Sequence, residues 1–535
     1  MSINKRPMSH TGHRIWNAVF VLLLIIILAH IRLIWVRVDE ADKQVQNLVP
    51  TCCDDQDYQM LAVNLLYGKG FSTSMNVPFE LYHFALDTDY SKDLKARYEQ
   101  DGVQAPAYDF YRHPGFPIQL TFTYAIFGNN PLNARRMIGM QAVITALLIY
   151  FTGVALSRWP GVIAGGLTAV YFLNFQPGLI QPLGLSYGAL MTETPTAFWI
   201  ALFCFSFVLY LKSNQRLLYL LLSALALACA VFTRLNFLPT VLLLSLYLYW
   251  KHYPVRHIML FAIVPIIPVI GWTVYASQAA GKFVPFSTQG DSLFAQSNNI
   301  EVIEGSIQNS PGDWAPGYTR DANGNIYSAH TNDPAPGESG WLKGLTFWRD
   351  NLSLLPKLFY IKLYAGFWNY YGFSINPLQP ERFHLLGIGF LLAALGIRAP
   401  KRVRTKFTEA HSLLTVLAML AILLIGGNHN PFPATILVWL VILACAWFVP
   451  YGNLIQLDFP APIWFLAFVA THLVTTGIFY GLRFHWPLDP ELMLFSLMGL
   501  VILVLIPLNQ WQNSRYWPLG GLNTKHEEAS PVSAD

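Results

Sequence analysis

Long apolar runs separated by short polar segments fill most of this chain. The first run, Val19 to Val36, is interrupted only by His30 and Arg32. It is too long for the apolar core of a secretory signal peptide, and no small-residue cleavage site follows it. A bilayer core of roughly 30 Å needs about 20 apolar residues per helix, so we interpret the run as a retained first span.

The same reading extends along the chain and predicts an all-α polytopic membrane protein with a bundle of about 12 transmembrane helices. An apolar stretch at 117–127 is shorter and Pro-flanked, which favours an interfacial helix. The aromatic-rich segment 346–372 suggests a re-entrant or amphipathic pair. The predicted spans are 15–36, 137–156, 159–176, 193–211, 216–232, 235–250, 256–275, 384–398, 409–426, 433–449, 461–480 and 492–508.

Lys and Arg in the short loops orient the predicted bundle. With a cytoplasmic N-terminus, most of these loops carry their positive charge inside, although Arg135 and Arg136 dissent. We therefore expect a multi-pass protein of the inner (plasma) membrane with both termini cytoplasmic. The predicted parts are a cytoplasmic N-terminus (1–14), a catalytic transmembrane module (15–275) that includes a large first extracytoplasmic loop (38–117) with amphipathic helices, a second extracytoplasmic loop (276–345), C-terminal transmembrane helices (346–508) and a cytoplasmic tail (509–535).

Composition supports this class and excludes others. Of the 535 residues, 54% are hydrophobic and 12% charged, whereas soluble domains are about 25% charged. Lys/Arg blocks with interleaved aromatics are absent from the sequence, so we expect no nucleic-acid partner. The sequence also lacks a Walker loop, an HExxH motif, a Gly-x-Ser-x-Gly elbow and a CxxC pair. These absences argue against ATP-driven transport, zinc proteolysis, a serine hydrolase and a structural zinc site.

Acidic residues open the stretch "CCDDQDYQMLAVNLLYGKGFS" (52–72) in the first long loop. Asp54, Asp55 and Asp57 precede apolar residues at helical spacing, and a Gly-x-Gly stop follows. The pattern predicts a short amphipathic helix at the membrane surface, with Asp54 or Asp55 at its N-terminus. Capping of the helix explains one acid, and local chemistry alone favours it. Three acids in four residues exceed what capping needs.

Further charged residues recur at the ends of the predicted outside segments. Arg112 and His113 precede a Pro-rich turn and suit an anionic phosphate, although an interfacial anchor is the favoured explanation when they are taken alone. Glu193 begins a span, where a helix cap is the simpler explanation. Arg234 lies between two spans. Just before the last span we place Arg483, His485, Asp489 and Glu491.

Taken in order, these stretches resemble the GT-C superfamily of membrane glycosyltransferases. The closer resemblance is to the bacterial branch of the dolichyl-phosphate-mannose-protein mannosyltransferase family, which includes the aminoarabinose transferases acting on lipid A. Asp-x-x-x-Tyr followed by "LAVNLLYGKGFS" matches the first-loop signature of that family, with Asp54 at the catalytic acid position and Tyr58 as its tyrosine. "YRHPGFPIQLTFTYAIFG" resembles the Pro-rich helix start, with His113 where the family often has Lys. "TETP", "STQGDSLFAQSNN" and "LRFHWPLDPELMLF" resemble later motifs.

The resemblance implies a polyprenyl-phosphate-sugar donor and a lipid, protein or glycan acceptor at the outer face. A carboxylate, for which we choose Asp54 over its neighbour Asp55, would act as general base, and Glu193 would orient it or the acceptor. The leaving phosphate would need cations. No cofactor is certain, and a divalent metal ion held by Asp54, Asp55 and Glu193 remains open. The expected phosphate-binding residues are Arg112, His113, Arg234, Arg483 and His485, with Tyr58 beside the substrate.

Two other readings stay open. A flippase of lipid-linked sugars would share the spans and the charges, but transporters often carry internal repeats and midplane sites. We find no repeat, and the acids lie at one face. An oligosaccharide ligase or polymerase would place its main outer loop late in the chain. The sugar, the acceptor, the polyprenol and the oligomeric state stay open at this point.

Overall fold

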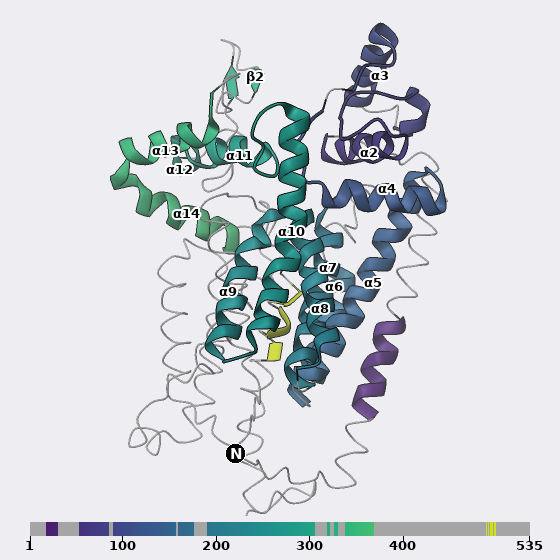
Figure 1. The fold of residues 1–535 in the computed structure, drawn as a ribbon, viewed down its shortest axis with the longest axis vertical. Coiled ribbons are helices and arrows are strands. Elements are labelled where there is room, and N and C mark those ends of the chain that lie inside the picture. Colours follow the sequence, from purple (N-terminus) through teal and green to yellow (C-terminus); the bar gives the residue numbers. More distant parts are fainter. Residues whose placement is uncertain are drawn as a thin grey trace, which may run out of the picture.

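Helices make up nearly all of the described chain in the computed structural model (Figure 1). Short strands occur only in one hairpin within that part. The described residues are 18–29, 53–84, 89–106, 108–156, 159–175, 190–213, 215–304, 318–320, 326–329, 338–368 and scattered positions between 488 and 498.

Six helices run side by side and form the apolar bundle (Figure 1). Three of them, α5, α7 and α10, are long and apolar enough to cross a membrane. The others, together with the N-terminal helix Ala18–Ala29, are shorter apolar helices. The six are α5 (Pro131–Leu156), α6 (Trp159–Phe175), α7 (Glu193–Lys212), α8 (Leu217–Thr233), α9 (Leu238–Trp250, preceded by the 3-10 turn η2, Leu235–Phe237) and α10 (Val255–Ala280).

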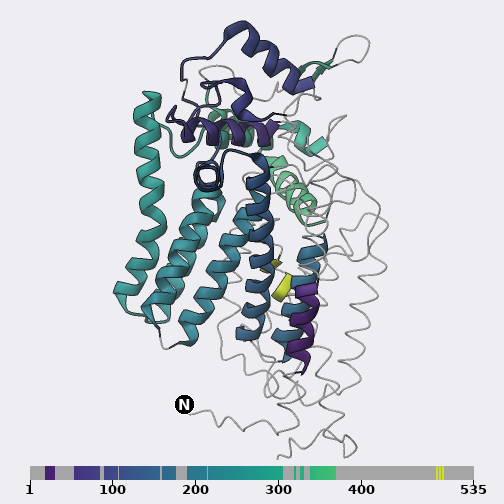
Figure 2. The same ribbon diagram turned by 90° about the vertical axis from the view of Figure 1, so that its right-hand side faces the viewer.

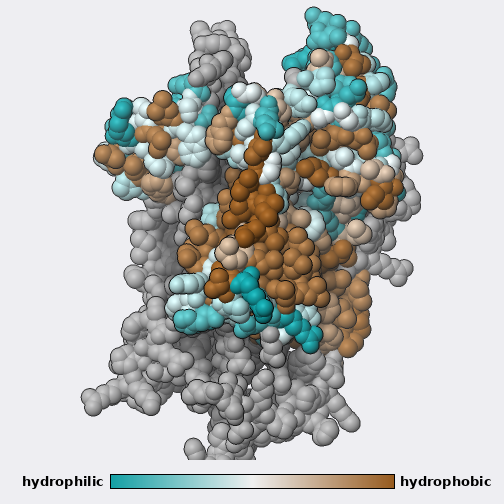
Figure 3. All heavy atoms as spheres, viewed as in Figure 1, coloured by the Kyte–Doolittle hydropathy of each residue, from teal (hydrophilic) through white to brown (hydrophobic). Residues whose placement is uncertain are grey.

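The surface of this bundle is apolar where it faces the viewer in Figure 3, and hydrophilic residues gather above and below it. Large apolar side chains such as Leu218, Leu242 and Ile267 stay exposed on α8, α9 and α10. Soluble monomers rarely expose apolar surface on this scale. The distribution is therefore compatible with a membrane protein, as the hydropathy pattern predicted.

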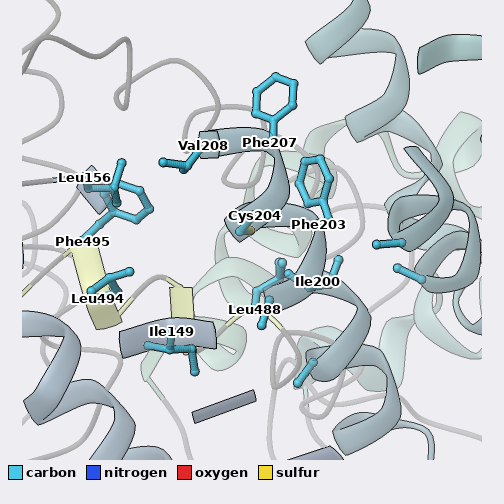
Figure 4. Packing of buried hydrophobic residues seen from close by; sticks show 14 of the residues in the cluster. Ile149, Leu156, Ile200, Phe203, Cys204, Phe207, Val208, Leu488, Leu494 and Phe495 are labelled. Carbon is cyan, nitrogen blue, oxygen red and sulfur yellow. The ribbon is translucent and has the colours of Figure 1, made fainter. Parts of the chain in front are cut away.

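Close packing inside the bundle depends on small residues where α5 meets α6. The backbone of Gly161 lies against the carbonyl of Gly153, so a side chain at either position would collide with the other helix. Above this contact the core is built from aliphatic and aromatic side chains of α5 and α7, including Ile149, Ile200 and Phe203 (Figure 4).

A second layer of helices lies across one end of the bundle, which we call the capped end. The layer contains α2 (Cys53–Leu66), the 3-10 turn η1 (Phe79–Tyr82), α3 (Asp89–Asp101) and α4 (Gly115–Phe127). In Figure 1, α4 runs across the bundle axis, and the view of Figure 2, turned by 90°, shows that α2 does so too. Both helices therefore lie at the end of the bundle where α5 and α7 begin.

Helix α2 confirms the predicted helix of the first loop but differs in its setting. Nearly every face of it is buried, including the side chains of Gln56, Gln59 and Asn64. The reason is the following loop, which supplies partners for its polar groups: Asn64 Nδ2 donates to the Ser72 carbonyl at 2.7 Å, and the Tyr82 hydroxyl donates to Asn64 Oδ1 at 2.8 Å. The polar face is thus covered by protein instead of water.

The second long segment is also more structured than the sequence predicted. Helix α10 continues to Ala280 and α13 begins at Gly340, so the loop is shorter than 276–345. Asp291 accepts hydrogen bonds from the Gly340 and Trp341 amides, both at 2.9 Å, and so caps α13. The elements are α11 (Gln289–Ser297), α12 (Ile300–Glu304), the antiparallel hairpin β1 (Tyr318–Arg320) and β2 (Ile326–Ala329), α13 (Gly340–Asp350), η3 (Leu352–Leu354) and α14 (Leu355–Trp368).

The predicted spans between 137 and 275 are confirmed as helices, and 117–127 is confirmed as a separate short helix, α4. Within the predicted segment 346–372, the described residues 346–368 form the end of α13, η3 and α14. Predicted spans from 384 to 480 lie outside the described residues, and only a few positions of 492–508 lie within them.

Candidate active site

Arg112 gathers two acids of the first loop, and we call this group the Arg112 cluster (Arg112, Asp54 and Asp57). Its Nη2 lies 2.6 Å from Asp54 Oδ1 and 2.8 Å from Asp57 Oδ2, and its Nε donates to Asp57 Oδ2 at 3.0 Å. The two acids are three residues apart in α2, which places them on the same helix face. Asp55 is rotated away from this face by about 100°, and it is buried.

The Arg112 cluster is partly shielded from solvent. The Arg112 side chain is 9% exposed, while those of Asp54 and Asp57 are 24% and 21% exposed. Burial raises the pKa of Asp57, and the opposing attraction of Arg112 only partly compensates. The guanidinium also lies over the rings of Tyr58 and Tyr111, 5.6 and 5.0 Å from their centroids. It is therefore held on several sides.

Arg234 forms a second group, the Arg234 cluster (Arg234, Glu193 and Thr192). Its Nη2 lies 2.6 Å from Glu193 Oε1, and its Nε donates to Thr192 Oγ1 at 2.9 Å. Glu193 is the first residue of α7, where the helix dipole favours a carboxylate. Arg234 follows the last residue of α8. The other carboxylate oxygen, Glu193 Oε2, is buried and has no hydrogen-bond partner in the described chain.

His113 lies between the two clusters. Its Nδ1 is 3.3 Å from the Thr233 carbonyl oxygen at the end of α8, and its ring packs 5.3 Å from that of Phe286. Burial lowers the pKa of His113 to about 4, and the charges of Arg234 and Arg112 lower it further against the effect of the Thr233 bond. His113 is therefore neutral near pH 7. The positive charge that a phosphate-binding role for His113 would require is therefore absent.

Tyr58 joins the two clusters. Its ring stands edge-on to Phe116 with centroids 5.1 Å apart. Burial raises its pKa to about 12, and the charges that act on it belong to both clusters, Arg112 and Asp54 from one and Arg234 and Glu193 from the other. The Tyr58 hydroxyl makes no hydrogen bond within the described part of the chain.

The approach of α4 to α8 makes this assembly geometrically feasible. Gly115, the first residue of α4, lies so close to α8 that an added Cβ would sit 2.5 Å from the Thr233 amide nitrogen and 2.6 Å from the Phe232 carbonyl carbon. Pro114 precedes it and Pro117 lies in the first turn, where the missing amide hydrogens cost nothing. Glycine at this one position lets the loop that carries Arg112 touch the bundle.

The two clusters together hold more negative than positive charge. Asp54, Asp57 and Glu193 contribute three carboxylates against the two guanidinium groups of Arg112 and Arg234. A metal site made by Asp54, Asp55 and Glu193 does not form: the described residues contain no group of three His, Cys, Asp or Glu side chains able to hold a metal ion.

The structure brings several of the sequence-predicted site residues together and adds others. Asp54, Tyr58, Arg112, His113, Glu193 and Arg234 come together as described above. Asp57, Thr192 and Thr233 are additional members. The three-residue spacing from Asp54 to Asp57 on a predicted helix was the signal that could have identified Asp57.

The segment before the last predicted span differs from expectation. Arg483, His485 and Asp489 lie outside the described residues. Glu491 is 2% exposed, and its charge acts on Cys204 inside the bundle instead of lying in an outer loop. Cys204 is eleven residues beyond Glu193, about 16 Å further along α7. The sequence neighbours of Glu491 are apolar, and Leu488, Leu494 and Phe495 pack into the apolar core (Figure 4). Their packing explains the inward position of Glu491.

Comparison with known proteins gives no match: no known family matches the chain, and neither a curated protein nor a solved structure does. The chemistry of the site must therefore be argued from its own geometry.

Proposed function

We propose that this chain is a membrane glycosyltransferase that moves a sugar from a polyprenyl-phosphate donor to an acceptor hydroxyl. The observation that carries the proposal is the meeting of two carboxylate–arginine clusters around Tyr58 at the capped end of an apolar bundle. The paired residues are far apart in the sequence: Arg112 and Asp54 by 58 positions, and Arg234 and Glu193 by 41 positions. Bringing costly charges together from such distances next to an apolar surface is typical of a functional site.

In this reaction Asp54 is the general base. Its carboxylate takes the proton of the acceptor hydroxyl while the acceptor oxygen forms a bond to the anomeric carbon of the sugar. The bond from that carbon to the phosphate oxygen breaks, and the polyprenyl phosphate leaves with the electron pair. One displacement inverts the anomeric centre. Asp54 is favoured over Asp55 because it faces Arg112 and is partly exposed, whereas Asp55 is 2% exposed.

The two arginines take different parts in this proposal. Arg112 holds Asp54 and Asp57 and so fixes the orientation of the base. Arg234 lies between the ends of two bundle helices, bound to Glu193, and is our candidate ligand for the leaving phosphate. Arg483 and His485 remain proposed contributors of positive charge. The acceptor is a lipid, a protein or a glycan.

The proposed setting is the inner (plasma) membrane. The chain would cross it about twelve times, with both termini in the cytoplasm and the capped end facing the exterior. In that orientation no nucleotide reaches the site, which agrees with a donor activated by a lipid phosphate. The apolar flank of α10 would face the bilayer that carries the polyprenyl chain.

A transfer assay tests the proposal. Purified protein in lipid nanodiscs is mixed with radiolabelled polyprenyl-phosphate sugars and a membrane acceptor extract, with and without a chelator. We expect label to move to a new product, and Asp54→Asn to lower turnover by about 10²- to 10⁴-fold. Asp93→Asn, the same change at an exposed position of α3, is the matched control and should leave turnover unchanged.

Two results would count against this proposal. Unaltered turnover in Asp54→Asn would remove Asp54 as the base. Donor binding without transfer to any acceptor would favour a flippase, which carries lipid-linked sugars across the membrane without breaking the bond to phosphate.

A further inference from the structure

The tautomer of His113 follows from its partner. Nδ1 faces the Thr233 carbonyl oxygen at 3.3 Å, and a carbonyl oxygen can only accept a hydrogen bond. Nδ1 therefore carries the hydrogen. In a neutral ring the other nitrogen, Nε2, then has a lone pair and can only accept.

Its surroundings keep the ring neutral. The charged groups that act most strongly on it are Arg234 of the bundle and Arg112 on its own loop, both positive, while the ring of Phe286 packs against it. Positive neighbours and burial each disfavour a second proton. The carboxylates of the site, Asp54 and Glu193, are already bound to these arginines.

The accepting nitrogen is available. His113 is only partly buried, and apart from the Thr233 bond its ring nitrogens make no hydrogen bond to the described residues. A leaving phosphate offers oxygen acceptors and no donor at neutral pH, so it cannot satisfy Nε2. A sugar hydroxyl can. The site thus presents one hydrogen-bond acceptor, His113 Nε2, beside the donor groups of Arg112 and Arg234.

We propose that His113 is a specificity-determining residue whose Nε2 accepts a hydrogen bond from one hydroxyl of the sugar being transferred. This inference rests on the proposed glycosyl transfer and adds to it what the sugar must carry: a hydroxyl donor near the bond that breaks. Binding of the phosphate is then left to other residues. A positive side chain at position 113 would place a donor where the sugar hydroxyl donates, and the two would clash.

Three variants separate this role from phosphate binding. His113→Phe keeps a ring against Phe286 and removes the acceptor. His113→Lys supplies a positive charge. His113→Gln keeps a neutral acceptor. The probes are polyprenyl-phosphate mannose, its 2-, 3-, 4- and 6-deoxy analogues, and polyprenyl phosphate without sugar.

With the full sugar we expect kcat/KM to fall by about 10- to 100-fold in His113→Phe, because a hydroxyl loses its partner in a shielded site. His113→Lys should fall at least as far, and His113→Gln should retain most of the activity. With one of the deoxy analogues the unmodified protein should lose a similar factor, and His113→Phe should cause little further loss. This non-additivity would identify the hydroxyl that is bound. Binding of polyprenyl phosphate should be equal in the unmodified protein and in His113→Phe.

Some results would overturn the inference. In one, His113→Lys binds polyprenyl phosphate more tightly and keeps its turnover, which would make position 113 a phosphate site. In another, His113→Phe lowers the rate by the same factor with every deoxy donor. Equal thermal stability of all variants controls for folding. If the unmodified protein transfers no sugar at all, the proposed function itself fails, and that outcome is distinct from either of these.

Discussion

The Arg112 and Arg234 clusters use the same chemistry in two different settings. Arg112 binds two carboxylates that are each more than a fifth exposed, on a loop helix outside the bundle. Arg234 binds one carboxylate that is 6% exposed, at the ends of two bundle helices. The difference teaches that an ion pair with the same length of 2.6 Å in both clusters does not contribute equally to the free energy of unfolding.

In the Arg112 cluster, if one partner of an ion pair is removed by substitution, water or the second acid can interact with the partner that remains. An ion pair near water contributes little, because solvent screens it and solvates either partner once the other is gone. In the Arg234 cluster both partners are buried, so water cannot solvate the one that remains. A buried pair is costly to break from one side, because an unpaired charge stays in a place that water does not reach. The two clusters should therefore respond differently to the same substitution.

The largest expected effect comes from Arg234→Met. This change leaves Glu193 buried without its cation and should lower the free energy of unfolding by about 3–5 kcal/mol. Arg112→Met should cost less, because Asp54 and Asp57 reach solvent. Thermal denaturation in detergent measures both. Adding Glu193→Leu to Arg234→Met should restore most of the loss; if Arg112→Met proved the more damaging, the contrast between the clusters would be wrong.

A smaller effect is expected where the two clusters are held together. Gly115→Ala places a methyl group against the backbone of Thr233 and should cost about 1–3 kcal/mol through overpacking. Because it pushes the Arg112 loop from the bundle, it should also lower turnover. Gly139→Ala, in α5 with open space around the added Cβ, is the matched control. It should be neutral or slightly stabilising, since alanine favours a helix.

The smallest effect concerns Asp57 and depends on pH. Its pKa in the folded protein is raised above the ordinary value of 3.8, first by burial. The folded state therefore holds this proton more tightly than the unfolded state, and the stability that Asp57 contributes is lost as pH rises through its raised pKa. Asp57→Asn removes this loss. Relative to the unmodified protein, the variant should gain stability as the pH rises above 3.8, by roughly 1 kcal/mol or less.

Thermal scans at several pH values, with Asp93→Asn as control, would detect this trend. A relative loss of stability in Asp57→Asn on raising the pH would contradict the direction of the shift. The result also sharpens the comparison of the two clusters. In the Arg234 cluster, loss of the Glu193 charge should not increase stability as it does at Asp57.

How much of this could be predicted from the sequence depends on the range of the forces involved. The helices α5 to α10 were predicted within a few residues because each apolar run by itself satisfies a bilayer or a core. The shared end of Asp54, Arg112, Glu193 and Arg234 followed from counting the spans. These features are fixed by local pattern and by chain direction.

Other features depend on what lies opposite in space. The burial of α2 arises from the loop that supplies partners to Asn64 and Gln59, and no periodicity in α2 reveals it. The neutral state of His113 depends first on its burial and then on Arg234, 121 positions away, and Arg112, while the partner of its Nδ1 is Thr233, 120 positions away. Glu491 was expected in a loop, but the apolar residues around it, including Leu488 and Leu494, pack inside the bundle. Such outcomes follow from tertiary contacts and cannot be obtained from one segment alone.

The contact between the His113 loop and the end of α8 has a consequence for the order of biosynthesis. The residues that meet there are separated by 120 positions, which the ribosome covers in roughly 6 to 24 s at 5–20 residues per second. During that interval Asp54, Asp57 and Arg112 are already synthesised, while the residue that completes the site has not emerged. A nascent chain arrested before α8 would therefore carry these acids and Arg112 without Thr233 and Arg234, and the two clusters could meet only once the end of α8 had been synthesised.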